Sequence, residues 1–333
     1  MTAGAPERTD RRGRGRSGAG RAHGSLRRAE ARAGLALITP TLIIVLVVVV
    51  VPILWTILLA FQDVRLLNLR RAGIFDPLTL DNVRAVLQSD DFVPSLLTTL
   101  AYSVFGTGLA ILFGLVAALA LRGAFRGRTF VRAAVLLPYV APVVAVTFAW
   151  RTMLNPQFGV VNELGVEFFG WDAPVAFLSE RSASVSILGL DISLPVALMT
   201  VIAFEAWRSF PFAFLFLTAR LQAAPATLEE AARVDGATPT QRFRYIILPQ
   251  LMPTIAVLAV LRFIWTFNSF DDIYLLTGGG AGTEVISVRV FNFLTARGDI
   301  GLASAQALVL AVILALLVGL YLRRFATREE TSA

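Results

Sequence analysis

The sequence contains no cysteine, which excludes disulfides, thiolate metal sites and cysteine nucleophiles. Its single histidine, His23, lies in an arginine-rich segment, so a histidine-based metal site is excluded as well. Lysine is also absent, because all 30 basic residues are arginines. A Walker A phosphate-binding loop and a Schiff base both require a lysine. Any ATP that drives this protein must therefore be bound by another polypeptide.

Charge is scarce: 16% of the 333 residues are charged and 56% are hydrophobic, and the mean hydropathy is +0.71. This composition is typical of a membrane protein. A bilayer core of about 30 Å requires around 20 mostly apolar helical residues, and six segments meet that length or nearly so. We therefore predict an all-α integral membrane protein with about six transmembrane helices. The predicted spans are Leu35–Phe61, Phe92–Leu121, Ala133–Leu154, Ile192–Ala219, Tyr245–Phe270 and Ile300–Leu322.

The arginines predict the orientation of these spans. Twenty of them lie before Leu35, in the 122–132 loop, in the 220–244 stretch and in the C-terminal tail, whereas the loops 63–91, 151–191 and 271–299 hold eight. Loops rich in arginine remain in the cytoplasm, so both termini are expected there. The first apolar run is too long for a cleaved signal peptide, and we interpret it as a retained anchor.

The first 33 residues form an Arg/Gly-rich arm of low complexity, for which we predict disorder. Similar arms bind RNA in some proteins. The alternative is that the arm is a topology signal that also binds anionic lipid. Arginine tracts beside membrane spans have this role for electrostatic reasons alone. We favour the second interpretation and expect membrane lipid, and no nucleic acid, as a partner of the arm.

Small residues and prolines inside the spans predict local packing. Gly106, Ala110 and Gly114 recur every four residues, which makes one face of the second span smooth enough for close helix contact. Pro138 and Pro142 each free a backbone carbonyl in the third span. We therefore expect that helix to be kinked or broken.

A polar loop, residues 220–249, separates the fourth and fifth spans and is punctuated like a pair of short helices. Pro225 suits the first turn of a helix, Thr227 and Glu230 have the spacing of a capping box, and Gly236 stands where a left-handed residue would end the helix. The first helix is thus expected over about 226–235.

A second short helix is expected directly after this glycine. Thr238 has the chemistry of an N-cap, Pro239 fits the first helical position, and Gln241 fits the third. Helices this short do not persist alone in water, so the first must pack on something. From composition alone, a protein partner and the bilayer surface remain equal alternatives.

The loop also carries a longer motif: Glu230-Ala231-Ala232, Gly236 and then Ile246-x-Leu248-Pro249. These residues reproduce the "EAA…G…I-x-L-P" signature, so the chain resembles the permeases of binding-protein-dependent ABC importers. The likeness covers about residues 90–322 and extends to the sugar-permease branch, which is similar to the maltose and glycerol-phosphate importers. It is supported by "LLPYVAPVVAVTFAWRTMLNPQFGVVN" (136–162), "EAWRSFPFAFLFLTARLQAAP" (205–225) and "FNSFDDIYLLTGGGAGTEV" (267–285). One departure is Ala281, since the family usually has proline after this glycine run.

The resemblance implies a type I ABC importer permease fold in a bacterial inner membrane. The expected organisation is the arm (1–33), a first helix and outer loop (34–91), a permease core with the coupling loop (92–322) and a cytoplasmic tail (323–333). The implied partners are a second homologous permease, two ATPase subunits that bind the ATP, and an extracellular solute-binding protein. The chain itself would be no enzyme and would hold no cofactor or metal. The loop would seat in a groove of the ATPase through Glu229, Glu230, Ala231, Ala232, Asp235 and Gly236.

Ionisable groups inside spans are costly, so they are candidates for the substrate pathway. Glu205 and Arg208 are three residues apart and are expected to pair on one helix face, whereas Arg262 stands alone in the fifth span. The alternative is a purely structural ion pair. Further candidates for contact with a sugar, by ring stacking or hydrogen bonds, are Trp265, Asn268, Asp271, Asp272 and Tyr274. Packing and interface anchoring are the commoner roles of such aromatic residues.

A rival function is ion-coupled secondary transport through Glu205, Asp271 or Asp272. Such transporters often contain inverted repeats, and the hydropathy pattern shows none. An intramembrane enzyme is a weaker rival, since the spans contain no Cys, His or Lys.

Overall fold

A computed structural model describes residues 34–71, 73, 76–187 and 190–330. The predicted arm, residues 1–33, lies outside this described part. The chain divides into two compact units, one ending at Leu58 and one beginning at Leu59. The described part of the first unit is a single apolar helix, which runs from Gly34 and continues to Ala60. It contains a π-helical turn, η1 (Leu46–Val50), and its last part is α2 (Val51–Ala60).

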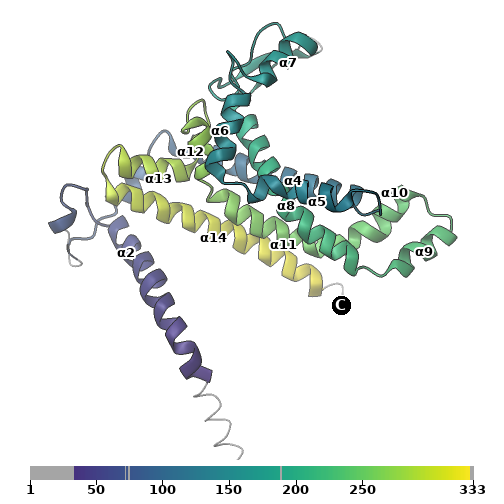
Figure 1. Cartoon of the computed structure of the whole chain (residues 1–333). Helices are drawn as coiled ribbons and strands as arrows, with labels where there is room; N and C mark the ends of the chain where they lie inside the picture. Colours follow the sequence, from purple (N-terminus) through teal and green to yellow (C-terminus); the bar gives the residue numbers. More distant parts are fainter. Residues whose placement is uncertain (1–33, 72, 74–75, 188–189, 331–333) are drawn as a thin grey trace, which may run out of the picture. The chain divides into compact units, whose positions relative to one another are not determined.

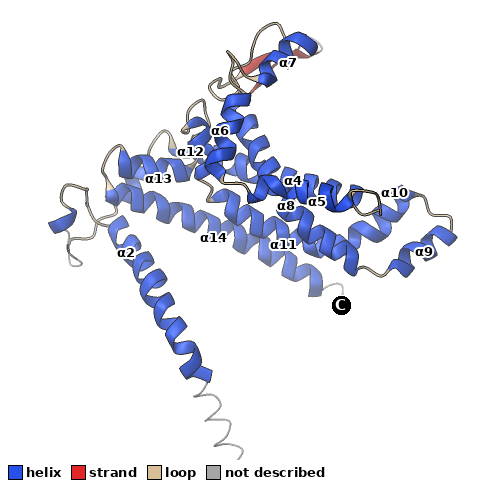
Figure 2. Cartoon of the chain, viewed as in Figure 1, coloured by secondary structure: helices blue, strands red, loops and turns tan. Residues whose placement is uncertain are grey.

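The second unit is almost entirely helical (Figures 1 and 2). Its elements are η2 (Leu69–Arg71), α3 (Asp81–Leu87), α4 (Phe92–Ala120), α5 (Arg128–Val140), α6 (Val143–Met153), α7 (Val160–Phe168), β1 (Ala183–Ile187), β2 (Leu190–Leu194), α8 (Val196–Ala223), α9 (Ala226–Val234), α10 (Pro239–Arg242), η3 (Phe243–Ile247), α11 (Leu248–Phe267), α12 (Asp271–Thr277), α13 (Ile286–Thr295) and α14 (Ile300–Glu330). The predicted tail after 322 thus continues the last helix as far as Glu330.

The predicted spans are present, and one of them is broken. Within the described residues, five helices are long and apolar enough to cross a membrane, and α5 and α6, which are bent by 96° from each other, add a sixth when the pair is taken as one span. The bend lies at Ala141, which is extended, and at Pro142, which caps α6. Proline disfavours helical backbone in the residue before it, which explains the break. The expected kink is confirmed at Pro142, whereas Pro138 remains inside α5.

The predicted bounds of the fourth and fifth spans were partly wrong. Ile192, the expected start of the fourth span, lies in β2, which pairs antiparallel with β1, and the helix begins only after Pro195. The fifth helix starts earlier than expected, because α10, the π-helical η3 and α11 form one continuous span from Pro239 to Phe267.

The smooth face predicted on the second span is confirmed as a helix contact. Gly106, Ala110 and Gly114 are buried, and α4 packs along α8. A Cβ atom placed on Gly114 would lie 2.6 Å from the Cβ of Ala213, and one on Gly106 would lie 3.0 Å from the Cγ of Glu205. The small residues therefore let two long helices approach closely, as in other membrane helix pairs.

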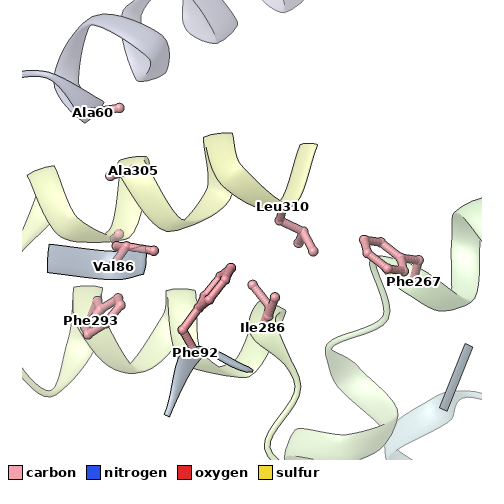
Figure 3. Packing of buried hydrophobic residues seen from close by; sticks show 9 residues of the cluster. Ala60, Val86, Phe92, Phe267, Ile286, Phe293, Ala305 and Leu310 are labelled. Carbon is pink, nitrogen blue, oxygen red and sulfur yellow. The ribbon is translucent and has the colours of Figure 1, made fainter. Parts of the chain in front are cut away.

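Buried apolar side chains join the last helices to the start of α4. Phe92, Ile286 and Phe293 pack with Ala305 and Leu310 in one cluster, shown in Figure 3. The backbone N–H of Ile286 also donates to the Oγ1 of Thr99, 3.0 Å away. This packing fixes α13 beside α4 and α14 against α13, and α11 and α8 also lie against α4.

The glycine run after α12 forms a tight turn. Ala281 has a φ of +53°, and within the described residues it is the sole non-glycine with positive φ. Proline has its φ locked near −65°. A proline at 281 therefore could not adopt this backbone, so the departure from the family pattern comes with a different turn. The hydroxyls of Thr277 and Thr283, 2.6 Å apart, join the two sides of this turn.

Candidate functional site

The coupling loop contains the two short helices that its punctuation predicts. The first, α9, runs from Ala226 to Val234, and none of its described side chains is buried. Val234 is 88% exposed. Nine residues make only about two and a half helical turns, too few to hold a helix in water without packing. We therefore expect the exposed face of α9 to pack against a partner.

The end of α9 is a complete Schellman motif. Gly236 is left-handed, with a φ of +79°. Its N–H donates to the carbonyl of Arg233 at 3.1 Å, and the N–H of Ala237 donates to that of Ala232 at 2.9 Å. These two bonds satisfy carbonyls that the last turn leaves unpaired. The predicted role of Gly236 is confirmed.

The beginning of α9 differs from the prediction. Pro225 is itself the N-cap, and no side chain caps the helix. The helix starts at Ala226, so Thr227 lies inside the first turn instead of before it, and the expected capping box with Glu230 does not form. The box predicted for the second helix is present: the N–H of Thr238 donates to the Oε1 of Gln241 at 2.7 Å, and the N–H of Gln241 donates to the Oγ1 of Thr238 at 3.3 Å.

The six candidate coupling residues fall into two groups. Glu230, Ala231, Asp235 and Gly236 are exposed, whereas Ala232 is half-buried. Glu229 is held within the chain: its Oε2 accepts from the Nη1 of Arg122 at 3.0 Å, and its Oε1 accepts from Nη2 at 2.5 Å. Sequence reasoning missed Arg122, which is 107 residues away and which no local spacing connects with Glu229.

The charged residues of the spans form pairs different from the predicted one. Glu205 does not pair with Arg208. Its carboxylate binds Arg262 of α11 and also accepts from the hydroxyls of Ser209 and Thr266, each 3.0 Å away. The pair is deeply buried, since 2% of the Glu205 side chain and 7% of the Arg262 side chain are exposed. Gly106 makes room for Glu205 against α4.

Arg208 pairs instead with Asp272, the second residue of α12, with the Nη2 of Arg208 3.2 Å from Oδ1 of Asp272. The Tyr102 hydroxyl lies 3.4 Å from Oδ2. Asp272 follows the fifth span and is fully buried. Burial, together with the nearby Glu205 carboxylate, raises the pKa of Asp272 to about 7, although Arg208 acts to lower it. We call Glu205, Arg208, Arg262 and Asp272 the four-charge cluster. It contains two arginines and two carboxyl groups, and it joins α8, α11 and α12.

The other candidate substrate residues lie more openly. Trp265 is 45% exposed and meets Phe212 edge-on at 5.2 Å between ring centroids. Tyr274 stacks on Phe270 at 4.9 Å. Asn268 and Asp271 are exposed, and the Asn268 amide donates to a carbonyl of its own helix at 2.8 Å. The structure thus separates the candidates into buried ion pairs and an exposed aromatic and polar group.

Sequence reasoning also missed a cavity of about 400 Å³ between α6 and α8. Five lining residues come from α6 and one, Trp207, from α8; the rings of Trp150 and Trp207 have centroids 5.4 Å apart. A signal was available, because Ala145, Ala149 and Met153 recur every four residues and line one face of α6.

Comparisons with known proteins agree with this geometry. Residues 110–329 match the model of a family described as "Binding-protein-dependent transport system inner membrane component". The inner membrane ABC transporter permease protein YcjO of Escherichia coli (strain K12) is 33% identical over 289 residues, which cover 86% of this chain and 92% of that protein. The trehalose/maltose transport system permease protein MalF of Thermococcus litoralis is 34% identical over 304 residues, which cover 90% and 95%.

A solved structure has the same fold. It is a chain of a bacterial alginate ABC transporter in complex with an alginate pentasaccharide-bound periplasmic protein. The two chains are 25% identical and superpose with a TM-score of 0.70 over 88% of this chain and 93% of the other. The helices described above are therefore those of an ABC importer subunit.

Proposed function

This chain belongs to the binding-protein-dependent transport system inner membrane components, and on that premise we propose that it is the permease subunit of an ATP-driven importer for a carbohydrate or related polyol. The observation that carries the proposal is the coupling loop. Its first signature residues form an exposed helix, α9, which is stopped at Gly236. After this turn, α10 begins at Pro239 and is continuous with the fifth span. Such a helix is suited to be displaced by a partner protein that binds to it.

The carbohydrate class rests on the relatives. One is named for trehalose and maltose, and the related structure is an alginate transporter. These likenesses extend over most of this chain and are not confined to the coupling loop. A disaccharide, an oligosaccharide or a polyol is accordingly the solute class to test first.

The partners of the proposal follow from what the chain lacks and exposes. Without lysine it cannot form a Walker A loop, so the ATP would bind to two separate ATPase subunits, and this chain would hold no cofactor of its own. A second, homologous permease would complete the pathway, and an extracellular solute-binding protein would deliver the solute. The related alginate transporter is itself in complex with a periplasmic protein.

The proposed mechanism places α9 against the ATPase through Glu230, Ala231, Asp235 and Gly236. Closure of the ATPase subunits on ATP would displace α9, and the continuous helix from Pro239 to Phe267 would carry that displacement into the membrane. The excess of arginines at the termini and in the 220–244 stretch supports an orientation with both termini and the coupling loop in the cytoplasm.

The solute would pass beside the exposed members of the candidate set. Trp265 and Tyr274 offer ring faces for stacking on a sugar, and Asn268 and Asp271 offer hydrogen-bonding groups. Glu205, Arg262 and Asp272 are enclosed in the four-charge cluster and would hold helices in place, with Arg208 at its partly exposed edge. We expect Asn268→Ala to lower uptake without loss of assembly, whereas unchanged uptake kinetics would place the pathway elsewhere.

Reconstitution in vesicles tests the function directly. The chain would be combined with its partner permease, the ATPase subunits and the solute-binding protein, and uptake of labelled disaccharides and polyols would be measured. We expect uptake to require ATP on the ATPase side and loaded binding protein on the other, and to survive an uncoupler while ATP is held constant. Uptake without the ATPase that collapses with the uncoupler would instead indicate ion-coupled secondary transport.

A further inference from the structure

The ion pair between Arg122 and Glu229 ties the exposed helix α9 to the end of α4. Two parallel N–H···O bonds, of 3.0 and 2.5 Å, join the guanidinium to the carboxylate. Bidentate pairing of this kind fixes direction as well as distance, because the guanidinium fork is planar and rigid. Within the described part of the chain, α9 makes no other ion pair.

Arg122 is itself firmly placed. It follows directly on Leu121, the C-cap of α4, and its backbone N–H donates to the carbonyl of Leu119 at 3.3 Å. The carbonyl of Leu121 accepts from the Nε of Arg128 at 3.1 Å and from the Nη2 of Arg132 at 3.0 Å. The end of α4 is thus joined to α5, and α4 packs along α8. Glu229 is therefore attached to a point that hydrogen bonds hold to the neighbouring helix α5.

The attachment decides how α9 is turned. A short helix that is connected to the rest of the chain only at its two ends, at Pro225 and Gly236, can roll about its own axis. Each residue advances about 100° around a helix, so with Glu229 facing α4 the opposite side presents Thr227, Ala231 and Val234. All three are exposed in the structure.

We propose that Arg122 and Glu229 are positioning residues, which set the roll of α9 so that the face with Thr227, Ala231 and Val234 is presented to the ATPase. This inference rests on the proposed function. Glu229 therefore does not contact the ATPase, as was expected, but orients the docking face from the opposite side of α9. Glu230 and Asp235 remain as the carboxylates open to a partner.

The proposal predicts a specific kinetic signature. Without the pair, α9 presents the correct face for only part of the time, and the apparent affinity for the ATPase falls by that fraction. Once the ATPase is bound, the same face is engaged, so maximal hydrolysis is unchanged. For an ion pair near the surface we expect the ATPase concentration at half-maximal hydrolysis to rise about fivefold.

The experiment titrates purified ATPase into vesicles that contain the permease and loaded binding protein, and it records hydrolysis. The variants are Arg122→Gln, Glu229→Gln and the exchanged double variant Arg122→Glu with Glu229→Arg. Arg126→Gln is the matched control, since it removes an exposed arginine from the same loop. We expect both single variants to need about fivefold more ATPase at the wild-type maximal rate, the exchanged variant to return toward wild type, and the control to match wild type.

Three outcomes would overturn the inference: single variants that titrate like wild type, an exchanged variant no better than the single ones, or a loss confined to the maximal rate. If the wild-type permease itself fails to bind or stimulate the ATPase, the proposed function fails first, which separates the two conclusions.

Discussion

The four-charge cluster and the Arg122–Glu229 pair use the same two chemical groups in opposite surroundings. In the cluster, the side chains of Glu205 and Arg262 are 2% and 7% exposed, and the hydroxyls of Ser209 and Thr266 donate to the same oxygen of the carboxylate. In the second pair, the side chains of Arg122 and Glu229 are 35% and 15% exposed. One pair lies between packed helices, and the other joins the core to α9, in which no described side chain is buried.

The two sites therefore differ in role: the buried cluster holds helices together, and the pair near the surface orients α9. A buried pair is costly to separate, because each charge is left without water, so the cluster keeps α8, α11 and α12 in one arrangement. A pair near the surface contributes little to stability but still fixes a direction. We therefore expect substitutions in the cluster to change the stability of the protein, and substitutions around α9 to change its communication with a partner.

The largest effect is expected when the buried pair is broken. Arg262→Met leaves the Glu205 carboxylate buried without its counter-charge and should destabilise the folded chain by about 3–5 kcal/mol. Thermal unfolding of the purified complex in detergent would measure this loss. The double variant Glu205→Leu with Arg262→Met is the control and should recover most of the stability, since apolar replacement of both charges is often neutral. A double variant as unstable as the single one would contradict this account.

The contact between α4 and α8 should respond next most strongly. In Gly114→Ala the new Cβ would lie 2.6 Å from the Cβ of Ala213 and 2.8 Å from the backbone nitrogen of Phe214, so the helices must separate. Overpacking of this kind costs about 1–3 kcal/mol. Gly108→Ala is the matched control, since nothing lies within 4 Å of its added Cβ. Equal unfolding temperatures for the two variants would show that the close approach is unimportant.

A smaller, local effect is expected at Gly236. Gly236→Val forces a β-branched residue into the left-handed backbone and should cost at least about 1–2 kcal/mol within α9. The spans should still insert, but co-purification of the ATPase and its stimulation by loaded binding protein should fall. Gly236→Asn, which tolerates the left-handed region better, should retain more of both. Wild-type association in the valine variant would indicate that the loop is only a surface connector.

The smallest change in stability is expected for Arg122→Gln. This pair, which lies near the surface, should contribute about 0–1 kcal/mol to the free energy of unfolding, in contrast to its larger effect on the ATPase titration. The same unfolding measurement used for Arg262→Met checks this prediction. A loss of stability as large as that of the buried pair would show that the two pairs do not differ in role.

Local signals in the sequence predicted local structure well. The stop at Gly236, the capping box at Thr238 and the break at Pro142 each depend on a few neighbouring residues, and the structure contains all three. The failed capping box at Thr227 shows the limit of such signals, because a shift of the helix start moves a cap into the helix. The count of six spans holds when the bent pair α5–α6 is taken as one.

The pairing of charges could not be predicted, since a sequence shows which face of a helix is polar but not which helix meets that face. Glu205 and Arg262 are 57 residues apart, and Arg122 and Glu229 are 107 apart. The i, i+3 spacing of Glu205 and Arg208 suggested a local pair, and tertiary packing overrode it. The hairpin of β1 and β2 was missed because β1 lies in a stretch interpreted as a loop, and the end of β2, from Ile192, was interpreted as the start of the fourth span.

The most direct test of the coupling account uses the absence of cysteine, which makes a single introduced thiol unambiguous. Val234→Cys on α9 and Leu67→Cys in the 63–91 loop would each place a thiol at a highly exposed position. Labelling by a membrane-impermeant maleimide would be compared in open vesicles with and without the ATPase. We predict that the ATPase protects Val234→Cys and leaves Leu67→Cys reactive. Equal labelling of Val234→Cys in both conditions would contradict the docking of α9 on a separate motor.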